Sequence, residues 1–141
     1  PATAVRNLVS NPTIRVTGRV PNMADVLRSA QVAIAPMQSG SGMQFKVLEA
    51  MACGIPVIAT TLGLGDIKAT PNSELLISNT PDEFIKATVQ LLTSSDLRMR
   101  IGSAGHNFVA RQHTWNSIND LFERTVITNL TKSKFSAASN T

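Results

Sequence analysis

The chain has 141 residues, which suits one domain and leaves too little length for two independent cores. Apolar residues make up 43% and charged residues 16%, a composition typical of a globular protein rather than of a disordered or membrane-spanning chain. The net charge of +4 favours anionic partners, but the scattered cations and an aromatic content of 4% argue against nucleic acid.

Short apolar runs alternate with stretches of helical spacing, a pattern typical of alternating strands and helices. Helices are predicted, in chain order, at residues 2–10, 23–29, 43–53, 81–93, 96–112 and 114–131. Strands are predicted between them at residues 13–17, 32–35, 57–60 and 74–78, with loops at residues 36–42 and 61–73. The polar residues expected near helix starts are Asn22, Thr80, Ser95 and His113.

The predicted strands are uniformly apolar, which indicates a parallel sheet with helices on both faces. We therefore expect an α/β, Rossmann-like fold in residues 1–131, followed by a polar tail at 132–141 that frays. A doubly wound sheet usually begins with a strand, whereas this chain begins with a helix, so we expect that at least one N-terminal βα unit of the parent domain is absent. The single cysteine, Cys53, and the lack of an export or membrane signal fit a cytoplasmic protein.

Residues 32–60 carry the most informative pattern, a buried strand that runs through Ser39-Gly40-Ser41-Gly42 directly into a helix. Glycines let the backbone approach a ligand, and the free amides at a helix start attract an anion such as phosphate. The loop lacks the third glycine of the dinucleotide fingerprint, the Gly-Lys-Ser/Thr of a P-loop and the Gly-x-Ser-x-Gly of a hydrolase elbow. A tight turn that binds nothing is the alternative.

The helix after this loop is apolar around most of its circumference and is interrupted by Lys46 and Glu49. Its apolar residues are Phe45, Val47, Leu48, Ala50, Met51 and Ala52, and we expect the helix to be mostly buried. Two interpretations stay open for the charged residues, since an unpaired buried charge is costly. In the first, Lys46 and Glu49 form an ion pair on the surface. In the second, Glu49 accepts hydrogen bonds from the cis-diol of a ribose while Lys46 faces phosphate.

Four strings run in order through the first part of the chain: Val16-Thr-Gly-Arg-Val20, Ala30-Gln-Val-Ala-Ile-Ala-Pro36, Gly40-Ser-Gly42 and Lys46-Val-Leu-Glu-Ala-Met-Ala-Cys-Gly-Ile-Pro-Val57. Three shorter ones follow: Pro81-Asp-Glu-Phe84, Leu97-Arg98 and His113-Thr-Trp115. Together they resemble the C-terminal domain of family-4 retaining glycosyltransferases of the GT-B fold, over nearly the whole chain to about Ile127. The block from Glu49 to Val57 is the most specific part.

The resemblance implies that this domain binds the nucleotide sugar and that an N-terminal domain binds the acceptor. It places Glu49 at the ribose, the glycine loop and the following helix start at the diphosphate and donor sugar, and residues 18–20 near the base. The residues expected to bind the NDP-sugar are Gly18, Arg19, Val20, Ser39, Gly40, Ser41, Gly42, Met43, Lys46 and Glu49. Ser41 stands where the family often has a Glu that contacts the transferred sugar. A subgroup of the family with Gly-x-Gly in this loop also lacks that Glu.

The expected function is therefore the donor-binding part of a glycosyltransferase that moves a sugar from an NDP-sugar to an acceptor with retention. By the resemblance it needs no metal or other cofactor, and this chain alone is expected to be inactive. Expected partners are the NDP-sugar, a missing N-terminal acceptor-binding domain, an acceptor that can be membrane-associated, and a second copy docked through surfaces exposed by truncation. The alternatives are a GT-B-fold UDP-sugar epimerase and a stand-alone binding or assembly module.

Four further residues offer chemistry that we expect to be unused. His106 and His113 lack acidic or cysteine neighbours at zinc-site spacing, so we expect solvated or capping roles for them. Cys53 ends a helix rather than beginning one and is expected to be a buried structural thiol. Asp66 is expected to be a turn residue, with an approach to the donor sugar as the alternative.

Overall fold

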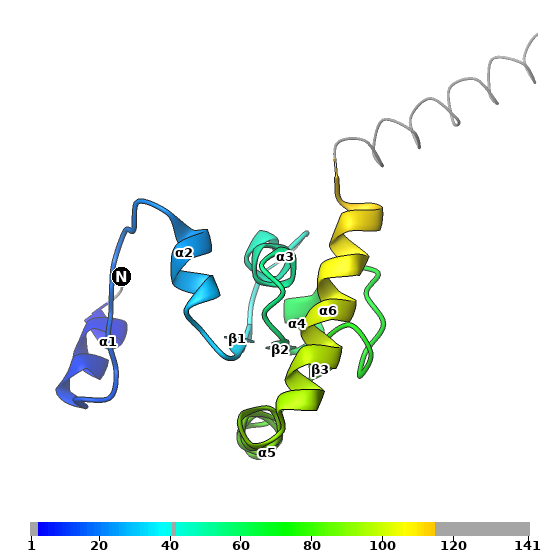
Figure 1. Cartoon of the computed structure of the whole chain (residues 1–141). Helices are drawn as coiled ribbons and strands as arrows, with labels where there is room; N and C mark the ends of the chain where they lie inside the picture. The colour runs from blue at the N-terminus through cyan, green and yellow to red at the C-terminus, as the bar shows by residue number, and fades with distance from the viewer. Residues whose placement is uncertain (1–2, 41, 115–141) are drawn as a thin grey trace, which may run out of the picture.

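The protein is described by a computed structural model that covers residues 3–40 and 42–114. Three short parallel strands, β1 (Ala33–Ala35), β2 (Val57–Ala59) and β3 (Leu76–Ile77), form a sheet in the order β1-β2-β3 (Figure 1). Ala35 lies opposite Ala59, and Ala59 lies opposite Ile77. The expected α/β, Rossmann-like fold is confirmed.

Helices cover both faces of the sheet. Helices α3 (Phe45–Ala52) and α6 (Ser95–Gln112) pack against each other on one face. The core on that face is built from Val47, Met51, Val57, Leu75 and Phe108, each of which is almost completely buried. Helix α5 (Pro81–Thr93) covers the other face, where Ile58, Ala87 and Leu91 form a second, smaller cluster.

Helix α6 approaches its neighbours closely because it carries glycine at its two nearest positions. A Cβ atom at Gly102 would overlap the carbonyl oxygen of Gly54, which follows α3. A Cβ at Gly105 would lie 2.8 Å from the carbonyl oxygen of Glu74. These contacts fix the position of α6 over the end of α3 and the start of β3.

The chain before α2 stands apart from this core in Figure 1, whereas α2 contacts α3. The helix predicted at residues 2–10 is divided into α1 (Thr3–Arg6) and the 3-10 helix η1 (Asn7–Ser10). The strand predicted at 13–17 is wrong: no ladder partner pairs with it in the described part of the chain, and Ile14 is exposed. The predicted cap of α2 (Met23–Arg28) is confirmed, since Asn22 Oδ1 accepts a hydrogen bond from Ala24 N at 3.0 Å.

Two further expectations need correction. The predicted loop at 61–73 begins with one helical turn, α4 (Thr61–Leu64), capped by the Thr60 side chain. Ser94 rather than Ser95 caps α6, whereas Thr80 caps α5 as predicted, in a capping box with Glu83. The helix predicted at 114–131 and the tail at 132–141 lie outside the described residues except for Thr114. No helix in the described ranges has both the length and the apolar character that crossing a membrane requires.

The glycine contact of α6 yields a test of its packing. An Ala in place of Gly within a helix normally stabilises it by up to about 1 kcal/mol. At Gly102 the sign should reverse, because the added methyl group meets the Gly54 backbone, and we expect the free energy of unfolding to fall by roughly 1–3 kcal/mol. Urea denaturation of Gly102→Ala measures this change, with Ser103→Ala on the exposed side of the helix as the control. Equal stability of the two variants would contradict the close approach.

Candidate functional site

The carboxyl ends of the three parallel strands lie at one edge of the sheet, so the loops that follow them converge there. They enclose an open hollow of about 850 Å³. Its lining comes from all three loops: Met37, Gln38, Gly40 and Gly42 after β1, Thr60, Thr61, Leu62, Gly65 and Asp66 after β2, and Asn79 after β3. The glycine loop singled out in the sequence therefore faces open space and is not covered by other side chains.

The first loop has a backbone shape that only glycine adopts readily. Gly40 and Gly42 have φ values of +129° and +77°. Three residues after Gly42 α3 begins, and no side chain caps its start. The amides of the first helical turn and the positive end of the helix dipole thus lie next to the hollow, an arrangement that favours an anion.

The second loop supports the first through its backbone and one hydroxyl group. Thr60 Oγ1 donates a hydrogen bond to the carbonyl oxygen of Met37 at 2.7 Å. A Cβ atom at Gly65 would lie 2.7 Å from the carbonyl oxygen of Gly42, so the two backbones touch directly at this point. The loop after β1 is therefore held near both of its ends.

The third loop is joined to the second by a side-chain amide. Asn79 Oδ1 accepts a hydrogen bond from Thr61 N at 2.9 Å, and Asn79 N donates to Glu83 Oε2 at 2.6 Å. The backbone N–H groups of Asn79 and Thr80 hold the pKa of the Glu83 carboxyl below its ordinary value of 4.5. The start of α5 thereby holds Asn79, which lines the hollow, in place.

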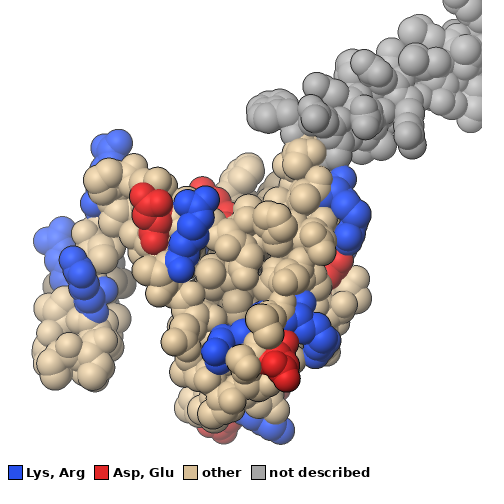
Figure 2. All heavy atoms as spheres, in the orientation of Figure 1, with Lys and Arg blue, Asp and Glu red and all other residues tan. Residues whose placement is uncertain are grey.

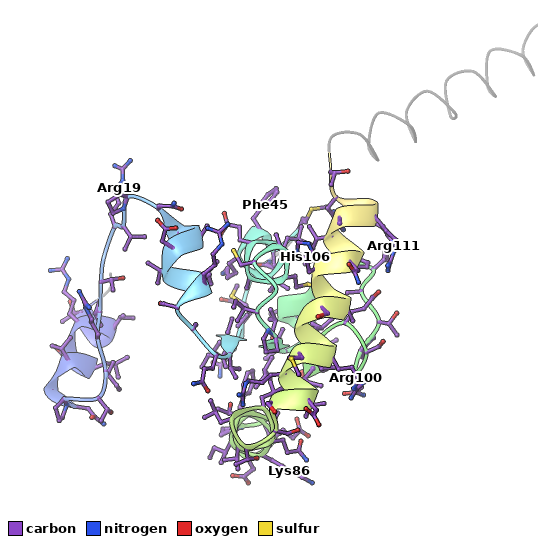
Figure 3. All side chains as sticks on the ribbon, viewed as in Figure 1. Arg19, Phe45, Lys86, Arg100, His106 and Arg111 are labelled. Carbon is purple, nitrogen blue, oxygen red and sulfur yellow. The ribbon has the colours of Figure 1, made fainter. Side chains whose placement is uncertain are left out.

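Helix α3 is buried on one side only, which corrects the expectation of a mostly buried helix. Val47, Leu48, Ala50 and Met51 are buried, whereas Phe45, Lys46, Glu49 and Ala52 are exposed. Phe45, labelled in Figure 3, is 69% exposed although we expected it in the core. Phe45 and Glu49 are four residues apart and therefore share one face of the helix. The charged side chain of Glu49 was the feature of the sequence that indicates exposure of this face to solvent.

The two charged residues of α3 do not pair with each other. No ion pair joins Lys46 to Glu49, so the surface pair that stayed open in the sequence is not formed. Lys46 Nζ lies 3.0 Å from Met37 Sδ, which brings the cation over a residue that lines the hollow. Glu49 lines a second hollow of about 460 Å³ between α2 and α3, together with Pro21 and Asn22.

The remaining predicted site residues are more dispersed. Gly18 lines a different, smaller hollow with Arg6 and Val9, and Arg19 is exposed on the loop before α2, away from α3 in Figure 3. Val20 is half-buried and precedes the residues that line the Glu49 hollow. Ser39 and Met43 are exposed beside the lining residues of the first loop, and Ser41 lies outside the described residues.

Two of the other candidate residues, His106 and Cys53, lie at the C-terminal end of α3. His106 Nδ1 lies 2.8 Å from the carbonyl oxygen of Ala52, so the imidazole caps the last residue of α3, a capping role as predicted (Figure 3). Cys53 is the half-buried C-cap of the same helix. Asp66 lies in a turn, as predicted, and also lines the large hollow, so the alternative of an approach to a ligand stays open. No group of three metal-ligating side chains is assembled within 3–40 and 42–114.

Thr60, Thr61 and Asn79 are site residues that the sequence interpretation missed. The available signal was their position, because each stands directly after or close to the end of a parallel strand. On the face shown in Figure 2, Lys and Arg side chains are distributed over several elements and do not gather into one patch. The geometry thus concentrates the ligand-facing features at the strand ends.

Comparison with known proteins places these features in a family. A profile described as "Glycosyl transferases group 1" matches residues 1–94. The "Glycosyltransferase 1 domain-containing protein 1" of Xenopus tropicalis is 33% identical over 99 residues, which are 70% of this chain and 28% of that protein. A Corynebacterium glutamicum protein named GDP-mannose-dependent monoacylated alpha-(1-6)-phosphatidylinositol monomannoside mannosyltransferase is 28% identical over 106 residues, with the same two coverages.

Solved structures share the fold at low sequence identity. The C-terminal domain of a glycosyl transferase group 1 family protein (LpcC) from Francisella tularensis superposes with a TM-score of 0.66 at 18% identity, covering 79% of this chain and 60% of that one. Sucrose-phosphate synthase from Thermosynechococcus elongatus gives a TM-score of 0.71 at 22% identity, covering 95% of this chain and 33% of that one. The chain spans about a third or less of the curated relatives described above.

The anchor on the third loop predicts a pH-dependent stability. A carboxyl whose pKa is lowered on folding contributes stability above its unfolded pKa, and this contribution is lost as the pH falls through the folded value. Wild type should therefore be more stable than Glu83→Gln at pH 7, and the difference should shrink as the pH falls below 4.5. Urea unfolding across pH measures it, with Asp82→Asn in the same helical turn as the control for lost charge. A pH-independent difference would contradict the role of the carboxylate.

Proposed function

Because the chain belongs to the group 1 glycosyl transferases, we propose that it is the donor-binding domain of a glycosyltransferase and holds a nucleotide sugar at its strand ends. The observation that carries the proposal is the open hollow of about 850 Å³ in which the Gly40–Gly42 loop leads into the uncapped start of α3. A ligand crevice at the carboxyl ends of parallel strands is the general position for nucleotides in such sheets. We further propose that the domain is of the family-4, C-terminal kind.

The diphosphate is assigned to the glycine loop and the first turn of α3. Backbone N–H groups and the helix dipole stabilise negative charge there. Lys46 stands one residue into the helix, and its ammonium group lies beside Met37 at the edge of the hollow. In transfer, these groups would stabilise the charge that develops on the departing diphosphate, which is the role a metal ion fills in other enzymes. Retention and independence of metal are parts of this proposal.

The ribose is assigned to Glu49. Its carboxylate is exposed, faces the hollow between α2 and α3, and takes part in no hydrogen bond or ion pair found among the described residues. It stands four residues after Phe45, roughly 6 Å along the axis of α3, which fits the step from a diphosphate at the helix start to a ribose. The base would then lie toward residues 18–22. One relative is named as GDP-mannose-dependent, so guanosine nucleotides come first in the panel of ligands.

The sheet itself indicates the kind of partner the domain needs. The edge of β1 away from β2 pairs with no strand in the described part of the chain, and Ile34 on this strand is 59% exposed. Next to it lies a largely apolar hollow of about 510 Å³ along α5. In the strand order 3-2-1-4-5-6 of a doubly wound sheet, β1 to β3 fit positions four to six. Further strands, supplied from elsewhere, would then pair beside β1.

Such strands would cover the edge of β1 that is unpaired in the described part of the chain. We propose that these strands, and a domain that binds the acceptor, complete the enzyme, and that this chain without them does not transfer sugar. Acceptance of a membrane-associated acceptor and formation of a dimer stay predictions, as does a cytoplasmic location.

Substitution of Glu49 tests the donor assignment. Losing hydrogen bonds to a charged group costs about 1.5–3 kcal/mol, so Glu49→Gln should weaken binding of the preferred nucleotide by roughly tenfold to a hundredfold. The melting temperature should stay unchanged, because the carboxylate is exposed and has no protein partner in the described part. Calorimetric titration with GDP-, UDP-, ADP- and dTDP-sugars measures the affinity, and Asp96→Asn on α6 serves as the control. Unchanged affinity with a lower melting temperature would show a structural role instead.

Substitution of Ile34 tests the completion of the sheet. In this chain Ile34→Asp should change the free energy of unfolding by less than about 0.5 kcal/mol, because the side chain is exposed. The same substitution should lower the melting temperature strongly in a fusion with the preceding part of the Xenopus tropicalis relative, where added strands would bury the aspartate. Hydrolysis of an NDP-sugar is expected from the fusion protein and not from the present chain alone. An equal, small effect of Ile34→Asp in both proteins would contradict pairing at this edge.

A further inference from the structure

We propose that Thr60 is a positioning residue for the diphosphate subsite: its hydroxyl group fixes the loop after β1 against the loop after β2. This inference rests on the proposed function. Thr60 is 8% exposed and stands directly after β2. Its position in the sheet is set by its own backbone, since Thr60 N donates to the carbonyl oxygen of Ala35 at 3.3 Å.

The two hydrogen bonds of the hydroxyl group fix its orientation. Gly63 N donates to Thr60 Oγ1 at 2.8 Å, so the oxygen accepts on that side. The single hydroxyl hydrogen is then directed to the carbonyl oxygen of Met37, 2.7 Å away. Because both partners are backbone groups next to the hollow, a side chain without a hydroxyl would leave a donor and an acceptor unpaired in a largely buried place.

Met37 connects this contact to the ligand-facing groups. Its side chain lines the hollow and lies 3.0 Å from Lys46 Nζ, while its carbonyl group is held by Thr60. A shift of the Met37 backbone would therefore move both the start of the glycine loop and the surface on which the Lys46 ammonium group rests. Thr60 thus controls the phosphate-facing groups without itself being needed to touch the phosphate.

The second loop is itself held rigidly, which a positioning role requires. The contact between Gly65 and the carbonyl oxygen of Gly42 closes the far end of the glycine loop. The hydrogen bond from Thr61 N to Asn79 Oδ1 ties the second loop to the end of β3. Displacing Met37 would therefore require loss of its hydrogen bond to a loop that is itself held in place.

Three variants separate positioning from stability. Thr60→Val keeps the shape of the side chain and removes the hydroxyl group, and Thr60→Ser keeps the hydroxyl group. Thr93→Val is the matched control, because the Thr93 hydroxyl also donates to a backbone carbonyl oxygen, that of Val89 at 2.7 Å, but does not line the hollow. For each, the affinities of GDP, UDP, ADP and dTDP are measured alongside those of guanosine, uridine, adenosine and thymidine. The ratio of diphosphate to nucleoside affinity reports on the phosphate subsite alone.

We expect Thr60→Val to lower this ratio at least tenfold, and Thr60→Ser and Thr93→Val to keep it. A lower melting temperature with an unchanged ratio would overturn the inference, because a merely structural hydroxyl group moves stability only. If the wild-type chain binds a diphosphate no better than its nucleoside, the proposed function fails as well. Should Thr60→Val not fold, amide hydrogen exchange in the wild type decides: a diphosphate should slow exchange at Gly63, and a nucleoside should not. Equal exchange with both would overturn the inference.

Discussion

The register of the parallel sheet positions every loop that lines the large hollow. Ala35 of β1 lies opposite Ala59 of β2, so both strands end together and their loops leave the sheet side by side. The carbonyl group of Ala35 accepts hydrogen bonds from Met37 N and Thr60 N and so joins the first residues of both loops. A slip of one residue would move Thr60 away from Met37 and reverse the faces of every strand side chain.

The end of β1 also determines where α3 lies. The short glycine loop leaves the end of β1 and delivers the helix with its start at the strand ends and its apolar side against the sheet and α6. The remaining side presents Phe45, Lys46 and Glu49 to solvent. Burial of one helix face thus determines which charged groups are available, and the direction of the helix puts its positive end nearest to the hollow. This combination is what an anionic, sugar-bearing ligand needs.

Local patterns in the sequence predicted the parallel fold, the strands 57–60 and 32–35 to within a residue or two, and the caps at Asn22 and Thr80, because burial and capping are encoded locally. The strand predicted at residues 13–17 is wrong because a β-ladder requires a neighbouring strand, and the local sequence pattern does not show whether one is present. Phe45 was placed in the core because its apolar side chain was weighed above the helix face it shares with Glu49. Thr60 was missed since its role arises only when two loops distant in sequence meet.

The central claim is that the glycine loop and the start of α3 bind the diphosphate of a nucleotide. The most direct measurement is a titration of the isotope-labelled wild-type chain with GDP and UDP, followed through its backbone amide resonances. We expect the largest changes at Gly40, Gly42, Phe45 and Lys46, with smaller ones around Glu49. Changes confined to the apolar hollow along α5, or none with any nucleoside diphosphate, would contradict it.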